Sequence, residues 1–560
     1  MTLSPIDVEL LRNAMGAVAD EVYYALMKSA YSTNIKERHD HSATIFDARG
    51  RVLVQGDSLP LHLASILGLV GIILDRFGHD DIHPGDMFIS NDPFVGKGSH
   101  LPDVALVAPV FHCGEIAMFV GNIAHHADIG GMAPGSMAGG MTEVYQEGLR
   151  IPPIKLMRGD EIVEDVLDMI LLNVRVPNER RGDYAAQIAA NRLGVRRCGE
   201  LLERWSPAAV AEGADEIIRA AARRLRAAIA ELPDGEYRFT DVMDDDGMGE
   251  AQIEIAVRIV VTGEEILFDF TGSAPQVKGN INVSSAGLQA CVFFALKVLL
   301  DPAAPMNHGM LEPIRIEAPK GTIVNADFPA ATAARAQTCQ RIVDVIFGAL
   351  AEAIPERVMA AGNGANTTAV FSGRGPTEAF YVYLETIGGG IGARSYKDGA
   401  EATQAHLTNT SNLPIEALEK EYPLMIERYE LVEESGGAGT WRGGLGLRRI
   451  YRPIGHVLTF SGQGERIVNP PPGLFGGEAG ATGSFAVRHG DGTEERLPGK
   501  PAPFEVSPDA AVAVVTPGAG GYGPPEGRDP AKLAEDLASG KFSADYLERH
   551  YGYREPTDEA

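Results

Sequence analysis

Histidine and aspartate side chains concentrate near the start of this 560-residue chain, where nine of the fourteen histidines lie between His39 and His126. Five of those nine fall in three short segments, residues 37–42, 91–103 and 122–131. Imidazole nitrogens and carboxylate oxygens together suit Zn²⁺, Mn²⁺ or Fe²⁺, because imidazole is a borderline ligand and carboxylate neutralises charge. The three segments therefore predict a divalent metal site.

The spacing within these segments limits which side chains can share an ion. His100 and Asp103 stand three residues apart around Pro102, so both can face one ion. His125 and His126 point in opposite directions if their segment is extended, so only one of them can join that ion. The other is then free to act as an acid, a base or a substrate contact. The residues alone leave an ordinary alternative open, in which these are solvated loops and surface histidines.

A helix and a series of strands are expected to position the three segments. Ser4 followed by a proline and by Asp7 is typical of a helix start, and apolar residues keep helical spacing from there. The first histidine segment then opens a β-hairpin. The expected elements are a helix from residue 4 to about 30, strands at 42–47 and 51–55, a helix at 61–77 and strands at 104–110 and 115–121.

The rest of the chain changes from a helical to a strand-like pattern. We interpret the whole as a multidomain α+β protein with a helix-plus-hairpin N-terminal region and a β-rich, glycine-rich C-terminal half. The expected elements are a helix at 208–231, strands at 237–242, 251–261 and 266–271, a strand-like stretch at 360–520, a last helix from Asp529 to near Gly540, and a frayed tail after about 553. The predicted domains are 1–205 (metal-binding, α+β), 206–355 (helix plus β-meander), 356–525 (glycine-rich β) and 526–560 (C-terminal helix and tail).

Composition and charge argue against several classes of protein. The formal net charge of −27 disfavours a nucleic acid partner, because a duplex would be repelled. Four widely spaced cysteines, none in a C-x-x-C pattern, predict neither a disulfide framework nor a thiolate metal site. The most apolar run, Leu59–Leu74, contains Pro60, His62 and Ser65 and is shorter than the roughly 20 residues of a membrane span. With no signal-peptide pattern at the N-terminus, we expect a reduced, soluble, cytoplasmic protein without a membrane partner.

Longer motifs are distributed over nearly the whole chain, roughly residues 3 to 552. They are Asn91-Asp92-Pro93-Phe94, Gly98-Ser99-His100-Leu101-Pro102-Asp103, His125-His126-Ala127-Asp128-Ile129-Gly130-Gly131, Gln146-Glu147-Gly148-Leu149-Arg150, Thr410-Ser411-Asn412 and Thr516-Pro517-Gly518-Ala519-Gly520-Gly521-Tyr522-Gly523. Together these motifs closely resemble the hydantoinase B/oxoprolinase family.

The resemblance implies one divalent metal ion and a set of ligands. In the family pattern the ion is held by an Asp in the first segment, by the His and Asp of His-x-x-Asp, and by the first His of the His-His pair. At these positions the chain has Asp40, His100, Asp103 and His125. His39 and His41 flank Asp40 where the family pattern has other residues, which leaves the first-segment ligand open. Zn²⁺ is the first choice, because two histidines with two carboxylates suit it, and Mn²⁺ is the alternative.

Two further residues are candidates for proton transfer. His126 and Asp128 adjoin a proposed ligand without necessarily binding the ion. Their alternative roles are the orientation of His125 and the stabilisation of the turn. Glu147 is a weaker candidate and is expected to be a structural contact.

The resemblance also implies a division of labour with a partner. A hydantoinase A-type ATPase subunit, which binds ATP and Mg²⁺, would phosphorylate the oxygen of a small cyclic amide, and this chain would hydrolyse the activated ring. The chain has no G-x-x-x-x-G-K-[ST] phosphate loop, which agrees with that division. Two alternatives remain: a subunit of a ketone carboxylase of the acetone or acetophenone carboxylase type, and a non-catalytic scaffold for the ATPase.

Overall fold

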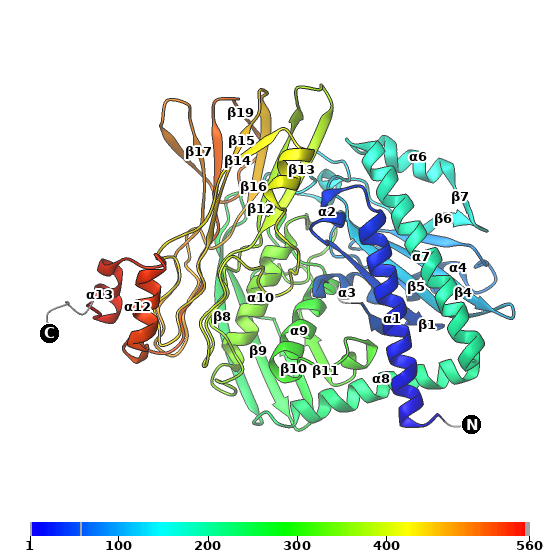
Figure 1. Ribbon diagram of the computed structural model, residues 1–560. Coiled ribbons are helices and arrows are strands. Elements are labelled where there is room, and N and C mark those ends of the chain that lie inside the picture. The colour runs from blue at the N-terminus through cyan, green and yellow to red at the C-terminus, as the bar shows by residue number, and fades with distance from the viewer. Residues whose placement is uncertain (1–2, 57–58, 555–560) are drawn as a thin grey trace.

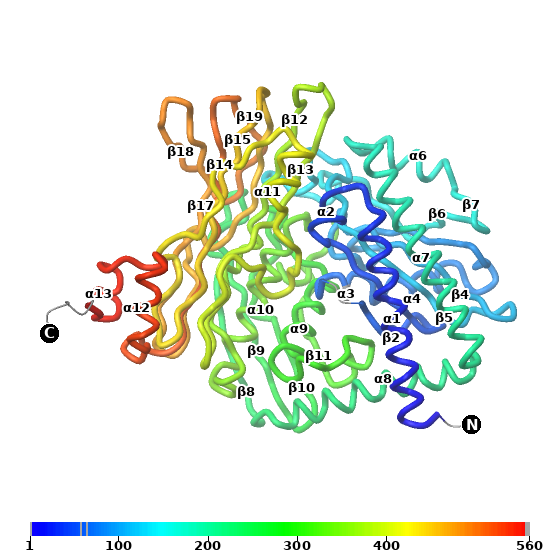
Figure 2. The backbone as a smooth tube through the Cα atoms, viewed as in Figure 1, coloured from blue at the N-terminus to red at the C-terminus, as the bar shows by residue number. Residues whose placement is uncertain are grey.

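The protein is described by a computed structural model that covers residues 3–56 and 59–554. Figure 1 shows three regions around two central helices, α9 (Ser285–Leu300) and α10 (Arg335–Leu350). The blue and cyan N-terminal region lies on one side and the yellow and orange C-terminal strands lie on the other, with the green middle region between and below them. Figure 2 traces the same path and shows helices α1 and α13 on opposite sides of the molecule.

Helix α1 (Pro5–Ser29) forms where the sequence predicts it. The Ser4 hydroxyl accepts the backbone N–H of Asp7, and the Asp7 carboxylate accepts the backbone N–H of Ser4, so this capping box satisfies two N–H groups that the helix leaves free. Its buried face packs on α7 (Pro177–Trp205), a 29-residue helix that the sequence analysis did not single out. That face consists of Leu11, Met15, Val18, Ala19, Val22 and Leu26.

A seven-stranded antiparallel sheet is the base of the N-terminal region, with the spatial order β2-β1-β5-β4-β3-β6-β7. Strand β1 is buried along its whole length, because Ala43 and Ile45 pack toward α1 and α7 while Phe46 packs toward the middle region. The predicted hairpin and the two strands after it are confirmed. The strands are β1 (His41–Asp47), β2 (Val52–Gln55), β3 (Met87–Ser90), β4 (Asp103–His112), β5 (Glu115–His125), β6 (Ile154–Arg158) and β7 (Glu161–Ile162).

Two helices, α3 (Pro60–Leu67) and α4 (Leu69–Phe77), replace the single helix expected at 61–77, because the helix is interrupted at Gly68. By length and composition the segment Pro60–Phe77 is apolar enough to cross a membrane, with a mean hydropathy of 1.5, but half of it is buried inside the protein. Ile66 and Val70 belong to the core that the sheet shares with the middle region. Core helices of this kind reach the same apolarity.

The middle region contains a four-stranded sheet, in the order β11-β10-β9-β8, and three long helices. Helix α8 (Pro207–Ile229) starts at Ser206 and, with strands β8 to β10, confirms the predicted helix and meander. Helices α9 and α10 were not predicted: most residues of both are buried, so no polar face marks the helical period. The strands are β8 (Gly235–Asp245), β9 (Ala251–Thr262), β10 (Glu265–Asp269) and β11 (Ile314–Glu317).

The predicted β-rich C-terminal half is confirmed as two packed sheets, ordered β13-β12-β16-β19 and β14-β15-β20-β17-β18. Their shared core includes Phe371, Tyr383, Tyr451, Phe460 and Phe485. The strands are β12 (Thr367–Arg374), β13 (Phe380–Ile387), β14 (Leu424–Leu431), β15 (Leu447–Pro453), β16 (Leu458–Gln463), β17 (Ser484–Arg488), β18 (Glu494–Leu497), β19 (Phe504–Val506) and β20 (Ala511–Val515).

Glycine-rich loops at 388–392, 436–446 and 518–523 pack backbone against backbone at one end of these sheets. A Cβ atom on Gly390 would lie 2.1 Å from the carbonyl oxygen of Gly444, and one on Gly443 would lie 1.9 Å from that of Ala519. Only glycine allows such an approach, which accounts for the glycine content of this half of the chain.

The remaining helices are short and cap the edges of the three regions. The predicted helix capped by Asp529 is confirmed as α12, but it is not the last one, because α13 follows it. The predicted frayed tail lies largely outside the described residues. These helices are α2 (Thr33–Lys36), α5 (Val144–Glu147), α6 (Glu164–Leu172), α11 (Ile415–Glu421), α12 (Pro530–Ala538), α13 (Ala544–Tyr551) and the 3₁₀ turns η1 (His308–Leu311) and η2 (Pro525–Gly527).

The regions share cores across the predicted domain boundaries. The first boundary falls at Ser206, between α7 and α8. One hydrophobic cluster nevertheless joins residues on both sides of it, among them Phe119 of β5 and Phe268 of β10. The division into four domains stays a prediction.

Candidate metal centre

Strand register brings three of the predicted ligands together. Asp103 is the first residue of β4 and His125 is the last residue of β5, and the two are directly paired in the antiparallel ladder. Asp40 immediately precedes β1, on the other side of β5, and its carbonyl oxygen accepts the backbone N–H of His125 at 3.0 Å. Adjacent ends of three strands therefore place these side chains at one edge of the sheet.

His100, Asp103 and His125 form a compact cluster, with one ligand atom from each lying within 4.8 Å of the others. All three are buried. His100 Nε2 and Asp103 Oδ1 are 3.0 Å apart. This is the donor set that Zn²⁺ and related ions take, two imidazoles and a carboxylate.

The orientation of His100 fits a metal ligand. Its Nδ1 lies 2.9 Å from the carbonyl oxygen of Ala333, to which it donates, so Nε2 of the neutral ring carries a lone pair. Neither Nε2 nor the facing Asp103 Oδ1 has a hydrogen-bond partner in the described part of the chain. Two buried lone pairs 3.0 Å apart repel one another unless a cation lies between them. The residues present therefore fit a bound divalent ion.

Electrostatics favours the ligand forms of these groups. Burial opposes ionisation of Asp103, but its neighbours, the charged Arg335 among them, outweigh burial and hold the pKa well below its usual value. Arg335 Nη2 donates to Asp103 Oδ2 at 2.6 Å, which leaves Oδ1 for an ion. Burial lowers the pKa of both His100 and His125, so their rings are neutral and can bind a metal.

Asp40 lies at the same centre without a hydrogen bond to its side chain among the described residues. Burial raises the pKa of this carboxyl group, and a bound cation would reverse that shift. Its Oδ1 is 3.5 Å from His62 Nε2, which is also 3.5 Å from Asp103 Oδ1. Asp40 borders the centre but is not in the group of three whose ligand atoms lie within 4.8 Å of one another, so its role as a ligand stays a prediction.

His62 was not selected from the sequence, yet its ring faces both carboxylates. It stands in the first turns of α3, and its Nδ1 lies 2.9 Å from the hydroxyl of Ser42. The signal in the sequence was a histidine inside an otherwise apolar run. Such a residue is unexpected in a buried segment unless it has a polar partner.

His125 is held by two residues of the α2 segment. Asn34 Nδ2 donates to the carbonyl oxygen of His125 at 2.6 Å and lies 3.1 Å from its Nδ1. Arg38, which is fully buried, donates to Asn34 Oδ1 and to the carbonyl oxygen of Leu384. The ligand is thereby tied to strand β13 of the C-terminal region.

The structure does not bring His126 and Asp128 to the cluster. His126 Nε2 lies 3.0 Å from Gln187 Oε1 and its ring stacks on Tyr184. Asp128 accepts hydrogen bonds from the backbone of Arg175 and from its guanidinium, and so holds the turn after β5. Their proposed role in proton transfer stays a prediction without geometric support, because the contacts match the alternative structural role.

Glu147 does not belong to the cluster but contacts the segment that orients His100. Its carboxyl group accepts the backbone N–H groups of Thr332 and Ala333, both at 2.6 Å. Burial raises the pKa of Glu147 to about 8. The contact fixes the segment whose carbonyl oxygen orients His100, in line with the structural role expected for this residue.

A small cavity borders the cluster, with about 30 Å³ open to the centre of a water molecule. Asp40, His62, Asp103, His125 and Arg335 form one wall of it. We call this the metal cavity. Its size suits a water molecule or the reacting end of a substrate.

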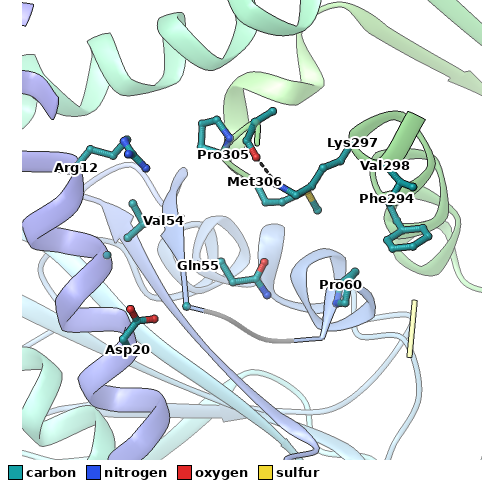
Figure 3. Close-up of a pocket in the computed structure, with 13 residues that line it drawn as sticks. Arg12, Asp20, Val54, Gln55, Pro60, Phe294, Lys297, Val298, Pro305 and Met306 are labelled. Atoms are coloured by element: carbon teal, nitrogen blue, oxygen red, sulfur yellow. Dashed lines mark hydrogen bonds between the residues drawn. The ribbon is translucent and has the colours of Figure 1, made fainter. Parts of the chain in front are cut away.

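A larger cavity of about 440 Å³ lies on the other side of the first turn of α3 (Figure 3). Pro60 lines this larger cavity, while Leu61 and His62 of the same turn line the metal cavity. In Figure 3 Arg12 and Asp20 reach into it from α1, opposite Lys297, which donates to the carbonyl oxygen of Ala304. The described residues that line it contain no group of metal ligands.

Comparison with known proteins agrees with this fold and site. The family model described as Hydantoinase B/oxoprolinase matches residues 4–525. The B subunit of a putative D-/L-hydantoinase from Pseudomonas sp. (strain NS671) is 34% identical, across 98% of this chain and 95% of that protein. The crystal structure of the ATP-dependent caprolactamase from Pseudomonas jessenii superposes with a TM-score of 0.94 at 30% identity, covering 100% of this chain and 98% of that one.

A more distant structure, nucleotide-free acetone carboxylase, gives a TM-score of 0.93 at 20% identity and covers 99% of this chain and 80% of that one, which shows the fold alone. The molecule is thus one of a class of multidomain α+β chains with a common architecture. The chain belongs to the hydantoinase B/oxoprolinase family, as its motifs predict.

Proposed function

We propose that this chain is the metal-binding component of an ATP-dependent cyclic amide hydrolase, and that a partner ATPase supplies it with a phosphorylated substrate. The names of its relatives, a hydantoinase and an ATP-dependent caprolactamase, support hydrolysis of a cyclic amide. The observation that carries the proposal is the pair of buried lone pairs on His100 and Asp103. They lie beside a cavity that suits a water molecule or the reacting end of a substrate.

The chain's own residues would perform three tasks. Asp40, His100, Asp103 and His125 would hold the ion, with Zn²⁺ proposed first and Mn²⁺ second. When bound, such an ion supplies a water nucleophile at neutral pH and polarises the reacting oxygen. Arg335 keeps Asp103 ionised and oriented. Thr332 and Ala333, fixed by Glu147, keep Nε2 of His100 turned toward the ligand set.

The proposed reaction needs a second subunit that binds ATP and phosphorylates the substrate. The chain lacks a phosphate-binding loop, and a relative that it matches along almost its whole length is named as one subunit of an assembly. We propose a hydantoinase A-type ATPase, which would hold ATP and Mg²⁺. All four cysteines are free, which supports a reducing, cytoplasmic setting.

The test is made on the chain co-expressed with its ATPase partner. We expect about one equivalent of divalent metal per chain, and ring opening of hydantoins or lactams that stops when ATP is withheld. Ring opening by the pure complex without ATP consumption would contradict the proposal. Incorporation of bicarbonate into a ketone, instead of release of a ring-opened acid, would assign the chain to the carboxylases.

A second comparison separates catalysis from scaffolding. His125→Ala should abolish turnover while the chain still folds and still binds its partner, because the backbone of His125 stays in the ladder with β4. Loss of folding and of the partner contact together with the metal would favour a purely structural ion.

A further inference from the structure

The metal cavity has a second wall, which the C-terminal region and the segments beside it supply. Asn366, Thr386, Leu407 and Thr408 line the same cavity as the metal ligands. None of these four side chains is charged. Any group that enters the cavity therefore meets the ligands on one side and neutral side chains, three of them able to form hydrogen bonds, on the other.

The amide of Asn366 is held in one orientation. Thr408 Oγ1 donates to Asn366 Oδ1 at 3.0 Å and accepts from Gln340 Nε2 at 2.8 Å. In this arrangement the oxygen of the Asn366 amide faces the Thr408 hydroxyl, and the nitrogen is turned away from it. Within the described part of the chain, Asn366 Nδ2 has no hydrogen-bond partner.

The nitrogen of this amide is the atom left for an occupant of the cavity. Asn366 is only 6% exposed and lines the metal cavity. Its Nδ2 is not among the polar atoms that are fully enclosed without a partner, so open space reaches the nitrogen, while Thr408 engages the oxygen. The donor is thus available to whatever occupies the cavity.

The backbone at Asn366 takes a left-handed conformation, with a φ of +36°. Asparagine adopts this region more readily than most other residues with a side chain. The hydroxyl of Thr368 donates to the carbonyl oxygen of Asn366 at 3.0 Å and helps to hold this conformation.

We propose that Asn366 Nδ2 donates a hydrogen bond to the oxygen on the reacting carbon of a cyclic amide whose reacting end enters the metal cavity. This inference rests on the proposed function and adds a substrate-binding residue to it. A neutral N–H donor suits a carbonyl oxygen, free or phosphorylated, and the bond strengthens as that oxygen gains negative charge. The proton stays on Asn366, so no covalent step is added.

Three variants separate the donor from the fold. Asn366→Asp keeps the shape and the acceptor for Thr408 but removes the donor. Asn366→Gly removes the side chain while its backbone tolerates the positive φ. Thr408→Val keeps the donor but releases the amide from its anchor. Asn412→Asp, at a partly exposed position outside the cavity, is the control for the same chemical change.

Each variant is assayed as the metal-loaded complex with the ATPase partner. The readouts are ATP-dependent opening of hydantoin and ε-caprolactam, binding of the same unreacted rings without ATP, metal content and Tm. We expect kcat/KM to fall about 100-fold in both Asn366 variants and about tenfold in Thr408→Val. Ring binding should weaken severalfold in the Asn366 variants, while metal content and Tm stay at wild-type values and the Asn412 control is unchanged.

Two results would overturn the inference with the proposed function intact. One is an active wild-type complex in which Asn366→Gly retains activity and ring binding within threefold. The other is loss of metal from Asn366→Gly in step with activity, which would make Asn366 a part of the metal site. A metal-loaded wild-type complex that hydrolyses ATP but neither binds nor opens any ring would overturn the proposed function itself.

Discussion

The two walls of the metal cavity are built on different physical principles. On the N-terminal wall, buried charged and ionisable groups face one another, as in the 2.6 Å contact between Arg335 and Asp103. On the C-terminal wall the side chains are neutral, and hydrogen bonds such as that from Thr408 to Asn366 set their positions. The rest of the C-terminal region includes close backbone contacts among and beside its glycine-rich loops. Asn363, for example, donates both its backbone N–H and its side-chain amide to the carbonyl oxygen of Gly390. The N-terminal wall contributes charged and ionisable groups to the cavity, and the C-terminal wall contributes neutral side chains in fixed positions.

This difference indicates how each wall should fail. A wall made of charges fails when one charge loses its partner, because the remaining charge is buried and uncompensated. The glycine-rich loops of the C-terminal region, which are made of close backbone contacts, fail when a single carbon atom is added, because a packed interior has no room for it. Substitutions on the two sides should therefore be distinguishable by metal content and by stability.

The largest effect is expected from the ligands. His125→Ala or Asp103→Asn should lower metal affinity by more than about 100-fold, since even the outer partners of metal ligands contribute 10- to 100-fold. Metal content after dialysis against a weak chelator measures the change. The exposed residue His83 provides the control substitution, His83→Ala. Normal metal content in His125→Ala would remove it from the ligand set.

In the glycine-rich loops of the C-terminal region, Gly443→Ala should destabilise the protein by about 3 kcal/mol, the cost of overpacking a rigid site. The added Cβ would lie 1.9 Å from the carbonyl oxygen of Ala519. Thermal unfolding of the metal-free protein measures the effect. A Tm within one degree of wild type would show that these loops can move apart and would weaken the contrast with the charged wall.

A pH dependence is expected where β8 meets the C-terminal region. Asp244 is buried, which opposes its ionisation, but backbone N–H groups of Asn469, Val468 and Ile467 outweigh this and lower its pKa. A lowered pKa means that the stabilisation is present above the unfolded value near 3.9 and is lost as the pH falls below it.

Asp244→Asn should therefore destabilise the protein by about 2 kcal/mol at pH 7, the contribution of hydrogen bonds to a charged group. The difference from wild type should be constant above pH 5 and should shrink below pH 4. Chemical unfolding at a series of pH values measures it. A difference that does not depend on pH would show that the carboxylate charge contributes nothing.

A smaller effect is expected from His62. His62→Asn should lower metal affinity about tenfold, as for a residue that contacts the ligands from outside the set. His456→Asn is the control, because His456 pairs with Tyr381 in the C-terminal region. A loss as large as that of His125→Ala would instead make His62 a ligand.

The smallest effect has the opposite sign. Gly16 lies inside α1 with open space around its Cα, so Gly16→Ala should stabilise the protein by roughly 0.5 to 1 kcal/mol. Comparison with Gly443→Ala by thermal unfolding tests whether glycine is required at both positions or only in the C-terminal loops.

The sequence was sufficient to predict the N-terminal helix and hairpin, the β-meander and the family, but not helices α7, α9 and α10 or the geometry of the site. The capping box of α1 and the first hairpin depend on neighbouring residues, and both formed as predicted. The direction of His126 depends on Gln187, which is 61 residues away, and no local pattern encodes that contact.

The same reason explains what was missed on the C-terminal wall. Asn366 belongs to no motif, and its role depends on a φ value and on a hydroxyl 42 residues further along the chain. His62 was hidden by the apolar residues around it. Helices α9 and α10 were hidden because burial on nearly all sides removes the amphipathic pattern.

The contact between His100 and Ala333 spans 233 positions of the chain. All four predicted ligands leave the ribosome well before the carbonyl oxygen that orients one of them. At 5 to 20 residues per second the delay is roughly 10 to 50 s. During that interval the N-terminal sheet lacks the carbonyl oxygen that orients His100. We therefore expect metal loading to be completed only after the middle region has been synthesised and has folded onto the sheet.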